Sequence, residues 1–184
     1  MDGVKKPAPS TAQWARIRLF AMDVDGILTD GTILTSSDGT ETKRFSIIDG
    51  LGLTLLRGAG LEIAWISGRL SAATTVRATE LKIAHVIQGR HDKLAALTSL
   101  AAELGIALSD CAYMGDDYLD AAAIAAAGVG ISVPTALPSA LAAADYVTRR
   151  PAGLGAVREV CDLILRARSA PGGKRRGPGN RPST

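Results

Sequence analysis

The chain is 184 residues long, which fits one domain that can bury a hydrophobic core without disulfides. Hydrophobic residues make up 47% and charged residues 21%, which excludes a disordered or fibrous protein. The net charge of +3 comes from the ends, because residues 169–184 carry +4 and residues 1–12 carry +1, which leaves the body at −2. We therefore expect a flexible N-terminus over 1–12, one domain over 13–168, and a disordered basic Gly/Pro-rich tail over 169–184.

The termini and the cysteines indicate a cytoplasmic protein. The N-terminus lacks the apolar region of a signal peptide, and no apolar run approaches 18 residues. Cys111 and Cys161 lie in apolar contexts without metal-ligand spacing, so we expect buried thiols in a reducing compartment. The tail carries four basic residues without interleaved aromatic residues, and we expect it to be solvated or docked on a partner rather than bound to nucleic acid.

Taken in order, the chain alternates strands with helices. The expected strands cover 17–22, 61–66, 84–87, 111–114, 129–132 and 146–148, and the expected helices cover 49–58, 70–80, 92–104, 118–127, 138–144 and 155–166. Asp49 is the expected cap of the first of these helices. Two β-prone runs flank Ser-Ser-Asp-Gly at 36–39, which predicts a β-hairpin flap over about 32–46. The alternation predicts an α/β fold with a Rossmann-like parallel sheet and helices on both faces.

Two acidic residues follow the first strand. Asp23 and Asp25 are two residues apart, so both side chains leave on the same side if the strand continues. Their mutual repulsion would reach about 4 kcal/mol at 4 Å and an effective dielectric constant near 20. Gly26 has no Cβ and allows a ligand to approach the backbone closely. The pair indicates a bound cation or a proton on one of the two acids, and the alternative is a solvated Asp-Gly turn.

Further polar groups follow other strands. Ser67-Gly68-Arg69 follows the second strand, Gly115-Asp116-Asp117 follows the fourth, and Lys93 lies in the first turn of the helix after the third. Taken singly, these residues fit a helix cap, a turn or a solvated lysine. Ligands bind beyond the carboxyl ends of parallel strands, however, so their joint occurrence predicts one site.

The composition of this site indicates phosphoryl transfer. Asp23, Asp25 and Asp116 offer the oxygen ligands that Mg²⁺ prefers, while Ser67, Gly68 at a helix start, and Lys93 would hold an anion. Positioning and charge neutralisation do most of the work in such a site. We expect Asp23 to be the nucleophile and Asp25 to be the general acid and base. Gly26, Asp117 and Asp120 are the expected supporting residues.

The chain also resembles a known superfamily. The set Asp23-x-Asp25-Gly26, Ser67-Gly68-Arg69, Lys93 and Gly115-Asp116-Asp117 resembles the four motifs of the haloacid dehalogenase-like phosphatases. More closely, residues 17 to 166 resemble the 3-deoxy-D-manno-octulosonate 8-phosphate phosphatase family. The segments that carry this closer resemblance are 23–31, 45–52, 88–93, 144–149 and 155–163.

This resemblance implies a Mg²⁺-dependent homotetramer of lipopolysaccharide biosynthesis that has no large cap domain, in which a neighbouring subunit closes each site. It implies that Asp23, the carbonyl of Asp25, and Asp116 bind the metal. It further implies that Ser67, Gly68 and Lys93 hold phosphate, and it makes Arg69 a candidate for binding the carboxylate of the sugar acid. The chain departs from the family pattern at Ser67, where threonine is usual, and in the tail.

The expected function is hydrolysis of 3-deoxy-D-manno-octulosonate 8-phosphate through an aspartyl-phosphate, with a small phosphorylated sugar acid as substrate and no membrane partner. One alternative is the same chemistry on a nine-carbon keto-sugar acid 9-phosphate. Another is a non-catalytic assembly module of the same fold, which is disfavoured because none of the motif acids is missing.

Overall fold

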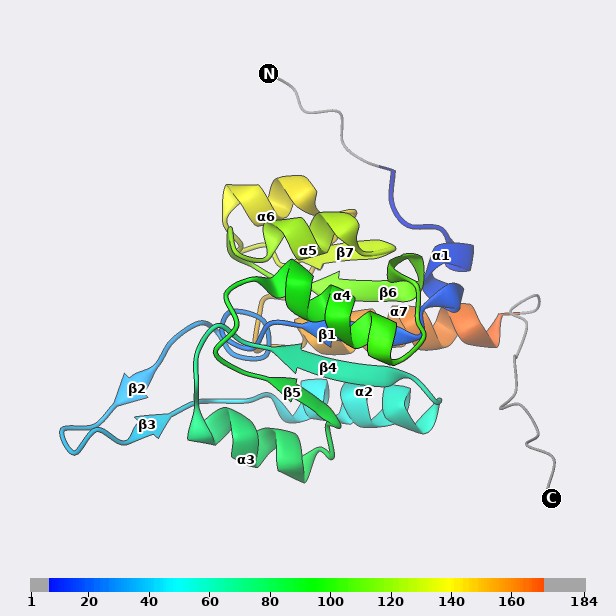
Figure 1. Cartoon of the computed structure of the whole chain (residues 1–184). Helices are drawn as coiled ribbons and strands as arrows, with labels where there is room; N and C mark the ends of the chain where they lie inside the picture. The colour runs from blue at the N-terminus through cyan, green and yellow to red at the C-terminus, as the bar shows by residue number, and fades with distance from the viewer. Residues whose placement is uncertain (1–6, 171–184) are drawn as a thin grey trace.

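A six-stranded parallel sheet runs through the centre of this computed structural model, which describes residues 7–170 (Figure 1). The strands are β1 (Leu19–Met22), β4 (Glu62–Ile66), β5 (His85–Ile87), β6 (Cys111–Met114), β7 (Val129–Ser132) and β8 (Tyr146–Val147). Their order is β5-β4-β1-β6-β7-β8, and each neighbouring pair is parallel. The predicted parallel sheet is therefore confirmed.

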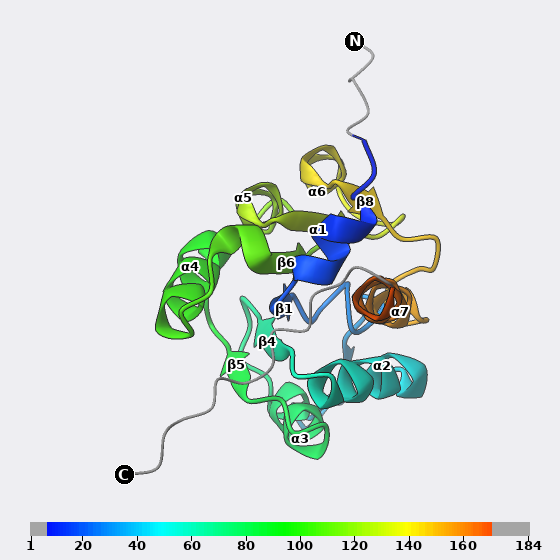
Figure 2. The same ribbon diagram turned by 90° about the vertical axis from the view of Figure 1, so that its right-hand side faces the viewer.

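Helices cover both faces of this sheet, as predicted (Figure 2). They are α1 (Thr11–Arg16), α2 (Ile47–Gly58), α3 (Ala72–Glu80), α4 (Lys93–Glu103), α5 (Ala121–Ala126), α6 (Pro138–Ala143) and α7 (Ala156–Ser169). One hydrophobic core contains Trp14 of α1, Leu53 of α2 and Val160 of α7. The other contains Leu97 of α4 and Ile124 of α5. The central strand β1 lies between the two cores and is fully buried, which explains its uninterrupted apolar sequence.

The predicted hairpin is present between β1 and α2. Strand β2 (Leu34–Thr35) pairs antiparallel with β3 (Glu41–Thr42), and Gly39 supplies the positive φ of +85° in the turn. The hairpin projects from the body of the molecule in Figure 1. Its role as a flap over the site stays a prediction.

The N-terminal helix α1 was not expected from the sequence. Its six residues follow a capping box in which Ser10 and Gln13 satisfy each other's backbone and side-chain groups, and Trp14 is buried. The expected domain boundary after residue 12 falls inside this helix. The residues 1–6 of the predicted flexible N-terminus and 171–184 of the predicted tail lie outside the described residues. None of the described helices is long and apolar enough to cross a membrane.

Asp49 does not cap its own helix, contrary to the sequence-based expectation. Ser46 caps α2 instead, and its hydroxyl accepts the backbone N–H of Asp49 at 3.4 Å. The buried Asp49 carboxylate accepts the backbone N–H groups of Gly155 at 3.1 Å and Arg158 at 2.7 Å. These groups lie at the start of α7, whose own N-cap is a glycine without a side-chain oxygen. Asp49 therefore links α2 to the last helix of the described chain.

Candidate active site

The predicted site residues meet at the carboxyl edge of the sheet. Asp23 follows β1, Ser67 follows β4, Asp116 lies two residues after β6, and Lys93 is the first residue of α4. A pocket of about 180 Å³ lies at this edge, and its lining residues are Asp23, Asp25, Ser67, Gly68, Arg69, His91, Lys93, Asp117, Leu119 and Asp120. Most of the predicted site residues therefore line one pocket, although Asp116 is not among its lining residues.

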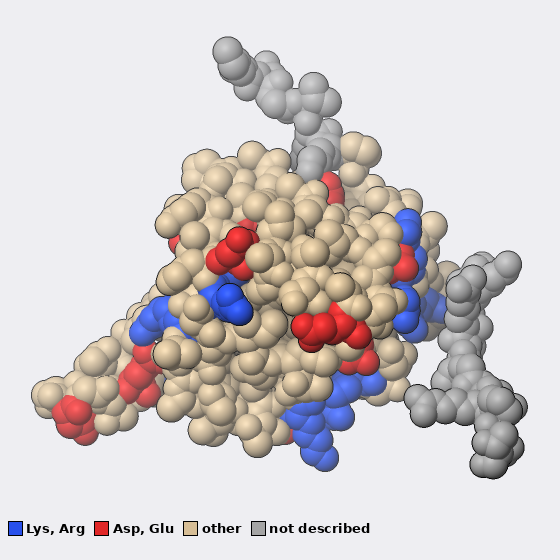
Figure 3. Space-filling model, in the orientation of Figure 1, with Lys and Arg blue, Asp and Glu red and all other residues tan. Residues whose placement is uncertain are grey.

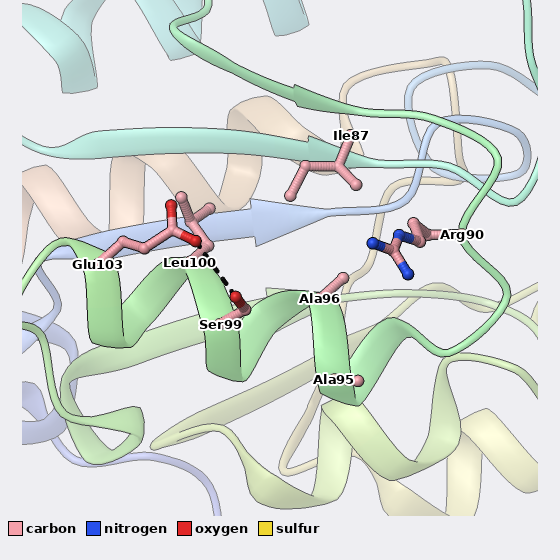
Figure 4. A pocket seen from close by; sticks show the side chains of 7 residues that line it. All are labelled: Ile87, Arg90, Ala95, Ala96, Ser99, Leu100 and Glu103. Atoms are coloured by element: carbon pink, nitrogen blue, oxygen red, sulfur yellow. Dashed lines mark hydrogen bonds between the residues drawn. The ribbon is translucent and has the colours of Figure 1, made fainter.

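A larger hollow of about 460 Å³ lies elsewhere, between β5 and α4 (Figure 4). It is lined by Ile87, Arg90, Ala95, Ala96, Ser99, Leu100 and Glu103. Glu103 accepts a hydrogen bond from the hydroxyl of Ser99 at 3.2 Å. None of the predicted site residues lines this hollow, so the smaller pocket is the candidate active site.

Three acidic side chains come together at the pocket. Carboxylate oxygens of Asp23, Asp116 and Asp120 lie within 4.8 Å of one another. The Oδ1 atom of Asp116 is buried and has no hydrogen-bond partner in the described structure. Asp120, expected only as a supporting residue, belongs to this acidic group, whereas the side chain of Asp25 does not. Three carboxylates this close together, one of which has a buried oxygen without a donor, fit a hard divalent cation.

Two glycines make this acidic group possible. A Cβ on Gly26 would lie 2.1 Å from Oδ2 of Asp116, and the φ of Gly26 is +90°. A Cβ on Gly115 would lie 2.3 Å from Cβ of Asp120. Both loops therefore need glycine to bring the carboxylates together.

Burial and repulsion between the carboxylates raise the pKa values of Asp23 and Asp116. Burial, followed by repulsion from Asp23 and Asp120, raises the pKa of Asp116 to about 7. Burial and repulsion from Asp120 raise the pKa of Asp23 to about 6, although the nearby Lys93 opposes the shift. A cation among these groups would favour their ionised forms.

Without Mg²⁺, we expect the stability of the protein to fall as pH rises from about 5.5 to 8. The pKa values of Asp116 and Asp23 in the folded protein lie above the ordinary value of 3.8. The folded state therefore binds more protons than the unfolded state in this range, and stability decreases with pH. In EDTA, we expect the Tm at pH 8 to be about 5 °C lower than the Tm at pH 5.5. Thermal melts at both pH values would measure this, and Mg²⁺ or Asp116→Asn should reduce the difference. A Tm that rises with pH in EDTA would contradict the shifts.

Lys93 is a buried cation of the site. Its side chain is 2% exposed, and Nζ donates to Oδ1 of Asp23 at 2.7 Å and to the carbonyl of Ile66 at 2.5 Å. Nζ also lies 3.7 Å from Oδ1 of Asp120. The lysine therefore ties the start of α4 to the residue that follows β1.

Ser67 and Gly68 line the pocket, but they do not lie at a helix start as expected. Helix α3 begins at Ala72 and is capped by Ser71. The Ser67 hydroxyl instead accepts the backbone N–H of Arg69 at 3.1 Å, which turns the loop after β4. Both residues thus line the candidate pocket from the loop after β4, and the expectation that they lie at a helix start was wrong.

Arg69 reaches over the pocket and pairs with an acid of the hairpin. One terminal nitrogen donates to Oε2 of Glu41 at 2.7 Å, and the other lies 3.9 Å from Oδ2 of Asp25. Glu41 also accepts the hydroxyl of Ser71 at 2.6 Å. The side chain of Arg69 is 45% exposed, so a ligand can reach it.

Two residues of the site were missed in the sequence. Lys43 donates to Oδ1 of Asp25 at 2.6 Å, and Tyr113 donates its hydroxyl to Oδ1 of Asp120 at 2.7 Å. The other oxygen of Asp120 accepts the backbone N–H groups of Asp116 at 3.2 Å and Asp117 at 3.1 Å. Period-two spacing could have indicated Lys43, because it lies two residues after Glu41, directly after β3, and its Nζ lies 3.8 Å from Oε1 of Glu41.

Comparisons with known proteins agree with this geometry. A family model described as haloacid dehalogenase-like hydrolase matches residues 62–160. The 3-deoxy-D-manno-octulosonate 8-phosphate phosphatase of Escherichia coli (strain K12) is 42% identical over 156 residues, which covers 85% of this chain and 83% of the relative. The enzyme of the same name from Yersinia pestis is 44% identical over 153 residues, covering 83% and 82%.

Solved structures give the same result. The 3-deoxy-D-manno-octulosonate 8-phosphate phosphatase of Moraxella catarrhalis, in complex with a magnesium ion, a phosphate ion and a KDO molecule, is 54% identical with a TM-score of 0.84, covering 85% of this chain and 90% of that one. A cobalt-bound form of the phosphatase from Haemophilus influenzae is 35% identical with a TM-score of 0.81, covering 84% and 91%.

Proposed function

Because the chain belongs to the 3-deoxy-D-manno-octulosonate 8-phosphate phosphatase family of haloacid dehalogenase-like hydrolases, we infer that it is a Mg²⁺-dependent phosphatase for that substrate. The observation that carries this inference is the joining of Asp23, Asp116 and Asp120 with the buried Lys93 at the carboxyl edge of the sheet. A relative with this fold binds magnesium, phosphate and KDO together, which supports the inference. The reaction is a step of lipopolysaccharide biosynthesis.

The metal would be held by Asp23, Asp116 and the backbone carbonyl of Asp25, with Asp120 beside them. When bound, Mg²⁺ neutralises the acids and the phosphate charge that would otherwise repel each other. Ser67, Gly68 and Lys93 hold the phosphate oxygens. The acids, the lysine and the loop after β4 thus position the phosphorus atom in front of Asp23.

The reaction proceeds in two steps. A carboxylate oxygen of Asp23 forms a bond to phosphorus while the ester bond to the sugar breaks, and Asp25 gives a proton to the departing oxygen. Asp25 then takes a proton from water as that water attacks the phosphorus of the aspartyl-phosphate. Inorganic phosphate leaves, and the carboxylate of Asp23 is restored.

A phosphate-release screen tests this function. The purified protein is offered 3-deoxy-D-manno-octulosonate 8-phosphate, a nine-carbon keto-sugar acid 9-phosphate and neutral sugar phosphates, each with Mg²⁺ and with EDTA. We expect the highest kcat/KM for the eight-carbon acid. Preference for the nine-carbon acid would favour the alternative substrate, and absence of turnover on every phosphate would favour a non-catalytic module.

We propose that Arg69 binds the carboxylate of the substrate, because a guanidinium matches a carboxylate with two parallel hydrogen bonds. Arg69→Ala should reduce kcat/KM for the sugar-acid phosphate by about 10- to 150-fold, the equivalent of a lost charge-assisted pair. Hydrolysis of p-nitrophenyl phosphate, which lacks this carboxylate, should change little. Measuring both substrates on the same variant decides the role, since equal losses would indicate that Arg69 only braces the loop through Glu41.

A homotetramer stays a prediction, and one feature of the surface supports it. Helix α2 exposes Ile47, Leu51 and Leu55, which are 82%, 50% and 43% accessible and lie on one face at a spacing of four residues. We propose that this stripe is part of a subunit interface.

On the face shown in Figure 3, basic side chains of the described residues lie beside acidic ones, which does not favour a nucleic-acid partner. A cytoplasmic location likewise remains a prediction.

A further inference from the structure

We propose that Lys43 is a positioning residue that holds Asp25 in place for proton transfer, so that the base of the hairpin is part of the catalytic apparatus. The proposal rests on the phosphatase function inferred above. It assigns a chemical role to the hairpin within its own subunit, in addition to any role as a flap.

The side chain of Lys43 is fully buried, although the residue follows the short strand β3 of a projecting hairpin. A buried ammonium group is stable only with partners. Its Nζ donates to Oδ1 of Asp25 at 2.6 Å and to the hydroxyl oxygen of Thr74 at 3.4 Å, and it lies 3.8 Å from Oε1 of Glu41. Thr74 is itself fully buried in α3. The lysine is therefore fixed from two elements before it reaches Asp25.

The two carboxylate oxygens of Asp25 have different surroundings. Oδ1 is taken by Lys43, whereas Oδ2 is buried and has no hydrogen-bond partner among the described residues. Asp25 lines the pocket, and a terminal nitrogen of Arg69 lies 3.9 Å from Oδ2. The bond from Lys43 therefore leaves one oxygen of Asp25 available to exchange a proton with the substrate.

Asp25 needs such support because it lies in the turn after β1, outside any helix or strand. Proton transfer requires the donor within hydrogen-bond reach of the departing oxygen, and small displacements lower the rate strongly. Lys43 supplies the restraint from 18 residues further along the chain. The rotation of the Asp25 carboxylate is thereby tied to the position of the hairpin base.

The adjacent residue provides a matched control. Arg44 carries the same charge but is 73% exposed, and it donates to Oδ2 of Asp30 at 2.6 Å on the surface. Lys43→Met and Arg44→Met each remove one positive charge from the same segment. Only the first leaves Oδ1 of Asp25 without its donor.

The test measures kcat/KM with Mg²⁺ for p-nitrophenyl phosphate, phenyl phosphate and a simple alkyl phosphate. The departing group becomes more basic along this series and depends increasingly on a proton from Asp25. In Lys43→Met we expect a loss of about 100-fold for the alkyl phosphate, and of about threefold or less for p-nitrophenyl phosphate. Arg44→Met should behave as the wild type. Thr74→Val, which removes the second anchor of the ammonium, should shift the series in the same direction by a smaller amount.

The outcomes separate this proposal from the proposed function. If the wild type hydrolyses the series but Lys43→Met and Thr74→Val lose the same factor on every substrate, or lose nothing, the positioning role is wrong and the phosphatase stands. If Lys43→Met does not fold, as judged by its thermal melt, Thr74→Val alone decides. If the wild type releases phosphate neither from these substrates nor from the sugar-acid phosphates, the proposed function fails and this proposal fails with it.

Discussion

Asp23→Asn is expected to reduce phosphate release by about 10⁴-fold or more, as the loss of a catalytic nucleophile does in other enzymes. An amide has nearly the volume of a carboxylate, but its oxygen is a poor nucleophile toward phosphorus. The substitution also removes one negative charge from the group formed with Asp116 and Asp120. The fold should therefore be kept, because Lys93 retains Asp120 at 3.7 Å as a partner.

Phosphate release and thermal melts on the same purified sample would measure both effects. Asp162→Asn is the matched control, since Asp162 pairs with Arg158 on α7, away from the pocket. The control should keep wild-type activity. Retention of more than about 1% of the wild-type rate by Asp23→Asn would remove Asp23 from the role of nucleophile.

Removal of Mg²⁺ should abolish activity, and its return should restore it. Without a cation, Asp23, Asp116 and Asp120 repel the phosphate as well as one another. The raised pKa values of Asp23 and Asp116 show how unfavourable their ionised forms are. Ca²⁺ should bind but inhibit, because its larger and looser coordination shell misplaces the nucleophile relative to phosphorus.

Binding can be separated from turnover by thermal melts in Mg²⁺ titrations. Mg²⁺ at about 100 times its Kd should stabilise the wild type by about 2.7 kcal/mol, and Asp116→Asn should lose most of this gain. The surface variant Asp110→Asn, which disrupts a pair with Arg16, should keep it. Full activity after exhaustive chelation would contradict the metal-dependent mechanism.

The positions of the motif residues followed from the sequence because they depend on local order. Asp23, Ser67 and Asp116 each come after a run of apolar residues that forms a strand, and parallel strands present their carboxyl ends at one edge of the sheet. Recognising the strands was therefore enough to bring these residues together. The expectation that Ser67 and Gly68 lie at a helix start was wrong, because helix α3 begins later, at Ala72.

The remaining contacts depend on tertiary structure. Asp49 is three residues after the cap of its own helix, and nothing in the local pattern indicates that its carboxylate binds backbone groups of Gly155 and Arg158. In the sequence, Lys43 looks like any solvated lysine of a hairpin. Its side chain is buried because α3 packs against the hairpin. Helix α1 was missed because six residues carry too little periodicity to be recognised.

The central place of β1 has a consequence for synthesis of the protein. This strand is made early, yet one of its neighbours, β6, ends only at Met114, and Asp120 follows later still. A ribosome must therefore release most of the chain before the nucleophile has both flanking strands and before the acids can gather around a cation. The hydrogen bonds of Asp49 can form only later still, because its backbone partners are Gly155 and Arg158. Chains shortened before α7 should be substrates for cellular proteases rather than weakly active enzymes.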